Sequence, residues 1–114
     1  MNQSEFERFT EDFIAKTADL LVVKGKEYAG SEDRLANFKR GAALTGVEPE
    51  QVCFIYLSKH YDAVATFLRE GEIPGAEPIT GRLHDLANYV LLLAALVRER
   101  QDVRAGLRLR ETQQ

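Results

Sequence analysis

The sequence predicts an all-α fold, a compact bundle of about four helices. Apolar residues recur at spacings of three and four in four segments, which is the period of a helix with one buried face. Glycine and proline residues separate these segments, and no alternating strand pattern competes with them. The chain has 114 residues, of which 45% are hydrophobic, enough for one modest core but not for two.

The first helix is expected from about Ser4 to about Lys24. Ser4 and Glu7 have the spacing of a capping box, in which each side chain pairs with the other's backbone N–H. The predicted buried stripe consists of Phe6, Phe9, Phe13, Thr17 and Leu20. Residues 24–30 contain two glycines, so the helix is expected to break or fray there.

A short second helix is expected to begin after a cap at Ser31 or Asp33 and to end at Gly46. Pro49 suits the first position of a third helix, because the N–H that proline lacks would be unpaired there, and Gly71 is its natural stop. The predicted stripe of the third helix is Phe54, Leu57, Tyr61, Val64 and Leu68.

The fourth helix is expected to follow a loop over residues 72–78, with Thr80 as its cap. Its predicted stripe is Leu83, Leu86, Val90, Leu93 and Val97, widened by Leu92 and Leu96. After Arg98 the apolar pattern fades and arginines dominate. We therefore expect a helical bundle domain over residues 1–100 and a partly frayed, arginine-rich extension over residues 101–114.

Composition limits the classes of function. The net charge of −3 argues against a surface for duplex nucleic acid, which needs a basic excess. Cys53 is the only cysteine, so an internal disulfide and a cysteine-rich zinc site are excluded, and its apolar neighbours predict a buried side chain. No signal peptide or membrane span is expected, since the longest apolar run covers only residues 89–97. A cytoplasmic protein is the simplest expectation.

Wide aliphatic stripes on so small a bundle predict apolar surface that the chain cannot bury by itself. We therefore expect a homo-oligomer, with a dimer as the default by symmetry.

The fourth helix carries the most informative polar residues. Asp85, Asn88, Tyr89 and Leu92 stand at i, i+3, i+4 and i+7, so they share one face, which borders the apolar stripe. A carboxylate near a core is costly unless a cation or several donors meet it. Two interpretations stay open: a structural ion pair with Lys59, Lys26 or an arginine, and a metal ligand.

Other polar groups have two interpretations as well. On the third helix, Lys59 and Asp62 share a face and His60 lies on the other flank, which describes either a solvated flank with a core histidine or part of a site. Residues 24–40 mix carboxylates, which suit Mg²⁺, with cations and an amide, which suit phosphates and bases. A phosphate-binding glycine loop, a Ser-His-Asp constellation and a histidine pair for zinc are not apparent.

Four motifs occur in an order that looks familiar: Lys24-x-x-Glu27-Tyr28-Ala29, Glu32-Asp33-Arg34-Leu35-x-Asn37-Phe38, Lys59-His60, and Asp85-Leu86-x-Asn88-Tyr89-x-x-Leu92-Leu93. Their order resembles small phage-borne proteins related to the nucleotide modification associated domain. More distantly, it is similar to the MazG-like all-α nucleoside triphosphate pyrophosphohydrolases. The resemblance covers roughly residues 20–100.

The resemblance implies an oligomeric helical scaffold on which carboxylates hold Mg²⁺ and water attacks a nucleoside triphosphate to release pyrophosphate. Carried over, Asp85, Glu27 and Asp62 are the candidate catalytic residues. Asp85, Glu27 and Asp33 are the candidate Mg²⁺ ligands. The candidate nucleotide-binding residues are Lys24, Asn37, Lys59, Arg82, Asn88 and Tyr89.

This sequence departs from the acid pattern of those enzymes. Gly81 and Arg82 stand four and three residues before Asp85, where an acid would be usual, and the third helix has Lys59 and Asp62 in place of an acid pair. Three hypotheses follow. The protein is a Mg²⁺-dependent nucleotide pyrophosphohydrolase of phage nucleotide metabolism, in the cytoplasm of the infected host. Alternatively it is a non-catalytic nucleotide binder on the same scaffold, or a phage protein-interaction module.

Overall fold

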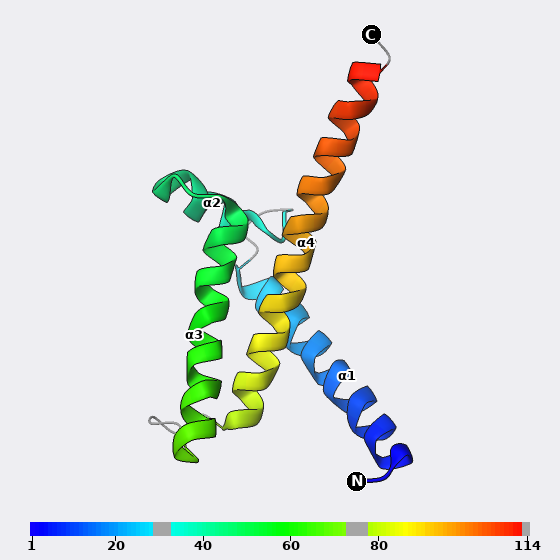
Figure 1. Ribbon diagram of the computed structural model, residues 1–114, viewed down its shortest axis with the longest axis vertical. Coiled ribbons are helices and arrows are strands. Elements are labelled where there is room, and N and C mark those ends of the chain that lie inside the picture. The colour runs from blue at the N-terminus through cyan, green and yellow to red at the C-terminus, as the bar shows by residue number, and fades with distance from the viewer. Residues whose placement is uncertain (29–32, 73–77, 113–114) are drawn as a thin grey trace.

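The computed structural model describes residues 1–28, 33–72 and 78–112, and these residues form four α-helices and no strand (Figure 1). The helices are α1 (Gln3–Tyr28), α2 (Ala36–Thr45), α3 (Pro49–Glu70) and α4 (Ile79–Thr112). The predicted all-α fold with four helices is therefore confirmed. None of the helices described is both long and apolar enough to cross a membrane.

The helices are arranged around α4. Helix α3 lies antiparallel to the first half of α4, α2 packs across the start of α3, and α1 crosses α4 at an angle (Figure 1). The second half of α4 extends beyond the other helices. The radius of gyration is 17.7 Å, whereas a compact domain of this length has about 13 Å. The bundle is thus open, not compact as predicted.

The helix ends follow local chemistry, with corrections to the predictions. Helix α1 is capped by Asn2 and Glu5, whose side chains each accept the other's backbone N–H at 2.9 Å. The predicted box at Ser4 and Glu7 was wrong by two residues. Helix α1 ends at Tyr28, within residues 24–30 where the break was expected, but four residues after the predicted end at Lys24.

The ends of α2 and α3 agree with the sequence. Gly46 and Gly71 end the two helices with φ of +76° and +79°, a left-handed conformation that glycine adopts without strain. Pro49 is the first residue of α3. Helix α4 begins at Ile79, so Thr80 lies inside its first turn and is not the cap. Of the two caps predicted for α2, Ser31 lies outside the described residues, and Asp33 is not the cap, because the N-cap is Leu35 without a side-chain hydrogen bond. The Asp33 carboxylate accepts the N–H of Leu35 just before the helix.

The buried core is small. It consists of Leu35, Phe38, Cys53, Leu92 and Leu96. Cys53 is fully buried, as predicted, and burial raises the pKa of its thiol to about 11. The core therefore joins α2, α3 and α4 and leaves α1 to pack along one side.

The apolar stripes predicted to be buried on α3 and α4 are mostly exposed. Phe54, Tyr61 and Leu68 on α3 are more than half exposed, and so is Val90 on α4. The residues expected only to widen the stripe of α4, Leu92 and Leu96, are its core residues. The face of α4 that faces inward is the one that carries Asp85, Asn88 and Tyr89.

Candidate ligand-binding pocket

A cavity of about 280 Å³ lies where the four helices meet. It is lined by Leu21, Lys24, Arg34, Asn37, Phe38, Tyr56, Asn88, Tyr89 and Leu92. Its wall thus combines two cations, two amides and two tyrosines with apolar side chains, and none of these nine residues is acidic. Such a mixture of apolar surface with a few convergent polar groups is typical of small-molecule sites.

Asn88 is the polar residue buried most deeply in this wall. Its side chain is 2% exposed, and neither the amide nitrogen nor the amide oxygen has a hydrogen-bond partner among the described residues. A buried amide without a partner costs about 1–3 kcal/mol, so proteins rarely keep one without a reason. Asn88 lines the cavity, but both amide atoms are shielded from solvent, so a ligand would reach them only after a shift of the neighbouring side chains.

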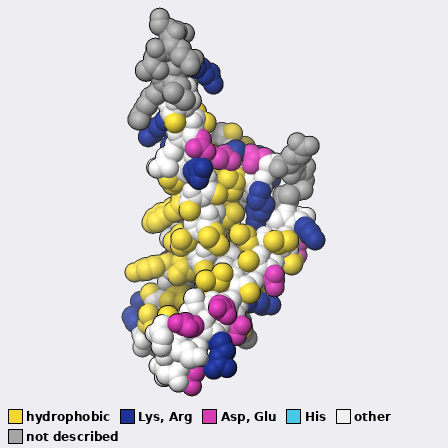
Figure 2. Space-filling view, turned by 90° about the vertical axis from the view of Figure 1, so that its right-hand side faces the viewer, with side chains coloured by type: hydrophobic (Ala, Val, Ile, Leu, Met, Phe, Trp, Pro, Cys, Tyr) yellow, Lys and Arg dark blue, Asp and Glu magenta, His cyan; other side chains and the backbone are white. Residues whose placement is uncertain are grey.

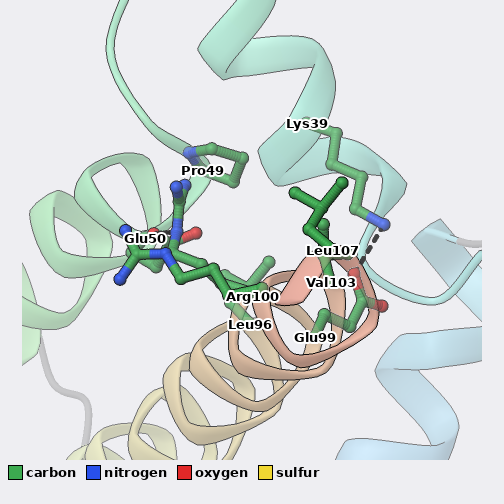
Figure 3. A pocket seen from close by; sticks show the side chains of 9 residues that line it. Lys39, Pro49, Glu50, Leu96, Glu99, Arg100, Val103 and Leu107 are labelled. Carbon is green, nitrogen blue, oxygen red and sulfur yellow. Dashed lines mark hydrogen bonds and ion pairs between the residues drawn. The ribbon is translucent and has the colours of Figure 1, made fainter. Parts of the chain in front are cut away.

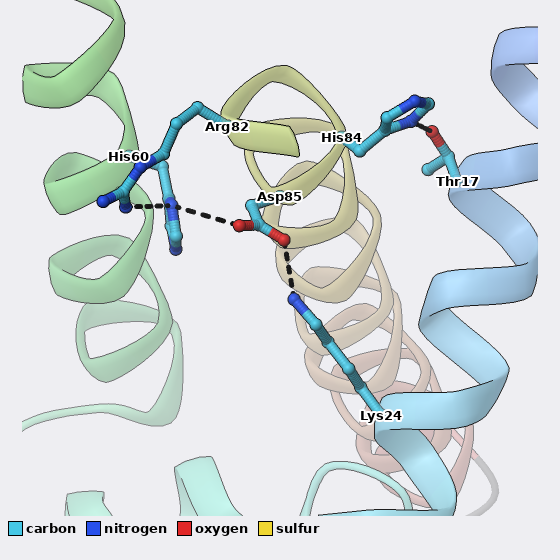
Figure 4. Close-up of polar contacts among 6 residues, drawn as sticks. All are labelled: Thr17, Lys24, His60, Arg82, His84 and Asp85. Atoms are coloured by element: carbon cyan, nitrogen blue, oxygen red, sulfur yellow. Dashed lines mark hydrogen bonds and ion pairs between the residues drawn. The ribbon is translucent and has the colours of Figure 1, made fainter. Parts of the chain in front are cut away.

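Asp85 stands one helical turn before Asn88 and is held by two neighbours. One carboxylate oxygen accepts a hydrogen bond from Lys24 Nζ at 2.6 Å, and the other lies 3.8 Å from His60 Nδ1 (Figure 4). The carboxylate thereby joins α1, α3 and α4. The predicted ion pair exists, but its cation is Lys24, not Lys59, Lys26 or an arginine. It fixes the position of an ammonium group that also lines the cavity.

The rings beside the cavity form a stacked series. The ring of His60 stacks on Tyr89 with 5.1 Å between centroids, and Tyr89 stacks on Tyr56 at 6.1 Å with 14° between the planes. Arg82 Nη1 lies 3.4 Å from His60 Nδ1 and holds the imidazole from the other side (Figure 4). Two of these rings, Tyr56 and Tyr89, line the pocket on its α3–α4 side.

A second histidine fastens α1 to α4. His84 Nδ1 and the buried hydroxyl of Thr17 lie 2.8 Å apart (Figure 4). The Phe13 ring stacks on the imidazole with 4.1 Å between centroids. This contact fixes the crossing of α1 over α4. The crossing in turn places Lys24, two turns after Thr17, at the cavity.

Gly25 makes room for the second cation of the pocket. It is buried within α1, and a Cβ at this position would lie 2.7 Å from Nε of Arg34. The Arg34 side chain therefore packs directly against the α1 backbone at a point that only glycine leaves open. This explains why a glycine, the poorest helix former after proline, stands inside α1.

The structure brings some of the predicted site residues together. Lys24, Asn37, Asn88 and Tyr89 line the cavity, while Asp85 and Arg82 join it through Lys24 and His60. Arg34, Tyr56 and His60 were not predicted as site residues. The signal for Arg34 was present in the sequence, since an interior glycine in a helix often marks a close approach.

The remaining predicted residues lie apart from this cavity. Glu27, Lys59 and Asp62 are exposed, and Lys59 lies over the outer side of the Tyr56 ring, 6.0 Å from its centroid. Asp33 pairs with Lys39 at 2.5 Å. This ion pair and the N–H of Leu35 lower the pKa of Asp33. Over residues 1–28, 33–72 and 78–112, no three His, Cys, Asp or Glu side chains are grouped so that they could hold a metal ion.

Comparison with known proteins gives no match: no family model, no curated protein and no solved structure is similar to this chain.

Proposed function

We propose that this protein binds a nucleotide, or a nucleotide-like signal molecule, in the cavity beside Asn88. The observation that carries this proposal is the buried Asn88 amide, whose donor and acceptor both lack a partner among the described residues. Adjacent donor and acceptor groups are what the edges of nucleobases offer, and an amide side chain pairs with such an edge through two hydrogen bonds. Binding would thus remove the cost of the unpaired amide.

The charges of the pocket support an anionic ligand. Lys24 and Arg34 line the same cavity as Asn88. Guanidinium and ammonium groups recognise phosphate through charge-assisted hydrogen bonds, which are about twice as strong as neutral ones. Because Asp85 already pairs with Lys24, the ammonium is held in place before a ligand arrives, which lowers the entropic cost of binding.

The shape of the pocket supports a single nucleotide. Tyr56 and Tyr89 line the cavity, and aromatic rings bind bases by stacking. The volume of about 280 Å³ is close to the lower limit of roughly 300 Å³ for small-molecule pockets. A mononucleotide is therefore a better match than a dinucleotide or a nucleic-acid strand.

Calorimetric titration with nucleoside mono-, di- and triphosphates, once in EDTA and once in Mg²⁺, tests the proposal. We expect binding that survives in EDTA and that weakens by about tenfold or more in Arg34→Met, because a charge-assisted hydrogen bond is lost. Arg69→Met removes a cation in the last turn of α3, outside the cavity, and is the matched control. The proposal fails if no nucleotide binds, or if both variants bind as the native protein does.

Hydrolysis of a nucleoside triphosphate to the monophosphate and pyrophosphate is a second candidate, which the sequence resemblance and the position of Asp85 favour. The resemblance implies Mg²⁺, and Asp85 is the carboxylate in contact with a cavity-lining cation, so Asp85 would be its protein ligand. The other predicted ligands do not join it: Glu27 is exposed, and Asp33 is paired with Lys39. The donor set thus fits a metal carried in by the nucleotide better than a resident ion.

Release of pyrophosphate separates the two candidates. The native protein is incubated with each nucleoside triphosphate and Mg²⁺, and Asp85→Asn is run beside it. Turnover that Asp85→Asn abolishes supports the enzyme. Tight binding without pyrophosphate release, unchanged by EDTA, supports the binder alone.

A further inference from the structure

Two helix ends of this molecule are largely exposed. Residues 3–12 of α1 are exposed except for Thr10, which is half-buried, and Phe6 is 53% exposed. Residues 101–107 of α4 extend past the other helices at the opposite end of the long axis (Figure 1). Isolated helix ends are marginally stable in water, and both ends carry large apolar side chains. Each therefore needs a surface to cover it.

The projecting end of α4 forms one wall of a groove of about 410 Å³ (Figure 3). Pro49, Leu96, Val103 and Leu107 supply its apolar surface. Its cations are Lys39, Arg100 and Arg104. Lys39 pairs with Glu99, and Arg100 pairs with Glu48 and Glu50.

Arg104 and the neighbouring Arg110 differ from these paired cations. Neither has an acidic partner among the described residues, although both are exposed. The groove thus has an apolar floor and, at Arg104, a cation without an acidic partner among the described residues, and Arg110 stands six residues further along α4.

The free end of α1 has the complementary chemistry. Glu7, Glu11 and Ile14 stand at i, i+4 and i+7 and share one face, with Phe6 beside them. Glu7 contacts only the amide of Gln3, and Glu11 has no cationic partner among the described residues. Figure 2 shows acidic side chains near the lower end of the molecule and hydrophobic side chains gathered over the middle of this face. This end is an amphipathic helix with an acidic margin.

We propose that a second copy of this chain is the partner, and that the first three turns of α1 from each copy lie in the α4 groove of the other. The two surfaces lie at opposite ends of a molecule 58 Å long, so a two-fold axis across its middle brings both pairs together at once. Helix-in-groove packing covers the apolar residues, and the acidic margin of α1 meets Arg104 and Arg110. Two such contacts double the buried area toward the roughly 1,600 Å² of a standard stable interface.

A charge-swap experiment tests the pairing by sedimentation velocity. One variant is E7K/E11K and the other is R104E/R110E, with circular dichroism to establish that both are folded. The native protein is expected to dimerise, and each variant alone is expected to have a dissociation constant raised by about tenfold or more, because like charges then meet in both contacts. An equimolar mixture of the two variants restores attraction in both contacts and is expected to dimerise again.

The matched control is E70K/E72K, which changes the net charge as E7K/E11K does but at the far end of α3. It is expected to dimerise like the native protein. A monomeric native protein overturns the proposal, and so does a native dimer that both charge variants leave intact. A mixture that stays monomeric overturns the pairing of these two surfaces. Species that grow with concentration beyond a dimer overturn the two-fold arrangement.

Discussion

The two faces of α4 differ in a way that hydropathy does not predict. The inward face carries Asp85, Asn88 and Tyr89 between the core and the cavity, whereas the outward face carries Val90, Leu91 and Val97, which are 40% exposed or more. A chain that folded only to hide apolar surface would turn this helix the other way. The inward polar groups indicate a binding role, and the outward apolar groups indicate surface that another molecule covers.

The strictest test of this difference between the two faces of α4 is to replace one leucine on each face with alanine. Leu96 is 2% exposed and Leu91 is 49% exposed on the same helix. Leu96→Ala is expected to lower the free energy of unfolding by about 3 kcal/mol, because it removes a side chain from the core and leaves a cavity. Leu91→Ala is expected to cost about 1 kcal/mol or less.

Urea denaturation of both variants at low protein concentration measures the difference. Equal losses would show that the two faces are equally buried in solution. In that case the inward orientation of Asn88 would have to be reconsidered as well.

Asn88→Leu tests whether the inward face of α4 keeps a polar group for binding at a cost in stability. The native amide is buried without a partner among the described residues, so an apolar side chain is expected to raise the free energy of unfolding by about 1 kcal/mol. The same change is expected to abolish nucleotide binding, because both hydrogen-bonding groups are lost. Thermal denaturation and calorimetric titration measure the two effects. A variant that is less stable than the native protein would show that the amide is paired in solution.

Gly25→Ala tests how the cations of the inward pocket are placed. The added Cβ would meet Nε of Arg34 at 2.7 Å and force that side chain away. We expect a several-fold loss of nucleotide affinity and little change in stability, since alanine also favours the helix by about 1 kcal/mol. Gly81→Ala is the control, because nothing lies within 4 Å of its added Cβ. Equal affinity in the two variants would count against a role for Arg34.

The smallest effect is expected from a substitution of Asp33, which lies outside both faces of α4. Lys39 first, and then the N–H of Leu35, hold the pKa of this carboxyl below its usual value of 3.8. The carboxylate therefore stabilises the fold above about pH 4, and this contribution is lost as the pH falls through the lowered pKa. Because the pair is partly exposed, Asp33→Asn should cost less than about 1 kcal/mol at pH 7.

Urea denaturation at pH 7 and at pH 2.5 compares Asp33→Asn with the native protein. The two should differ at pH 7 and converge at the lower pH. A difference that persists at pH 2.5 would mean that Asp33 acts through its hydrogen bonds in the neutral form.

Local signals in the sequence were sufficient for the end of α2, for both ends of α3 and for part of the site. Gly46, Pro49 and Gly71 act through backbone geometry that needs no distant partner, so their positions could be predicted. The shared face of Asp85, Asn88 and Tyr89 follows from helix period alone. The partners of that face could not be predicted, because Lys24 and His60 stand 61 and 25 residues away in the sequence.

The predicted stripes failed for a related reason. Periodicity finds the apolar side of a helix, but α3 and α4 carry apolar residues around more than half of their circumference. Which part of that circumference turns inward depends on the other helices. Phe38 and Cys53 fill the space between α2, α3 and α4, and they leave Phe54 and Tyr61 outside.

By itself, the sequence determined that the described residues form four helices, where α2 and α3 end, that Cys53 is buried, and that Asp85 and Asn88 share a face. These properties depend on backbone conformation and helix period, which act within a few turns. The tertiary structure decided that this polar face turns inward, that Lys24 is the partner of Asp85, and that Arg34 passes over Gly25. These depend on how α1 crosses α4, and that crossing is fixed by contacts such as Thr17 with His84, which no local pattern encodes.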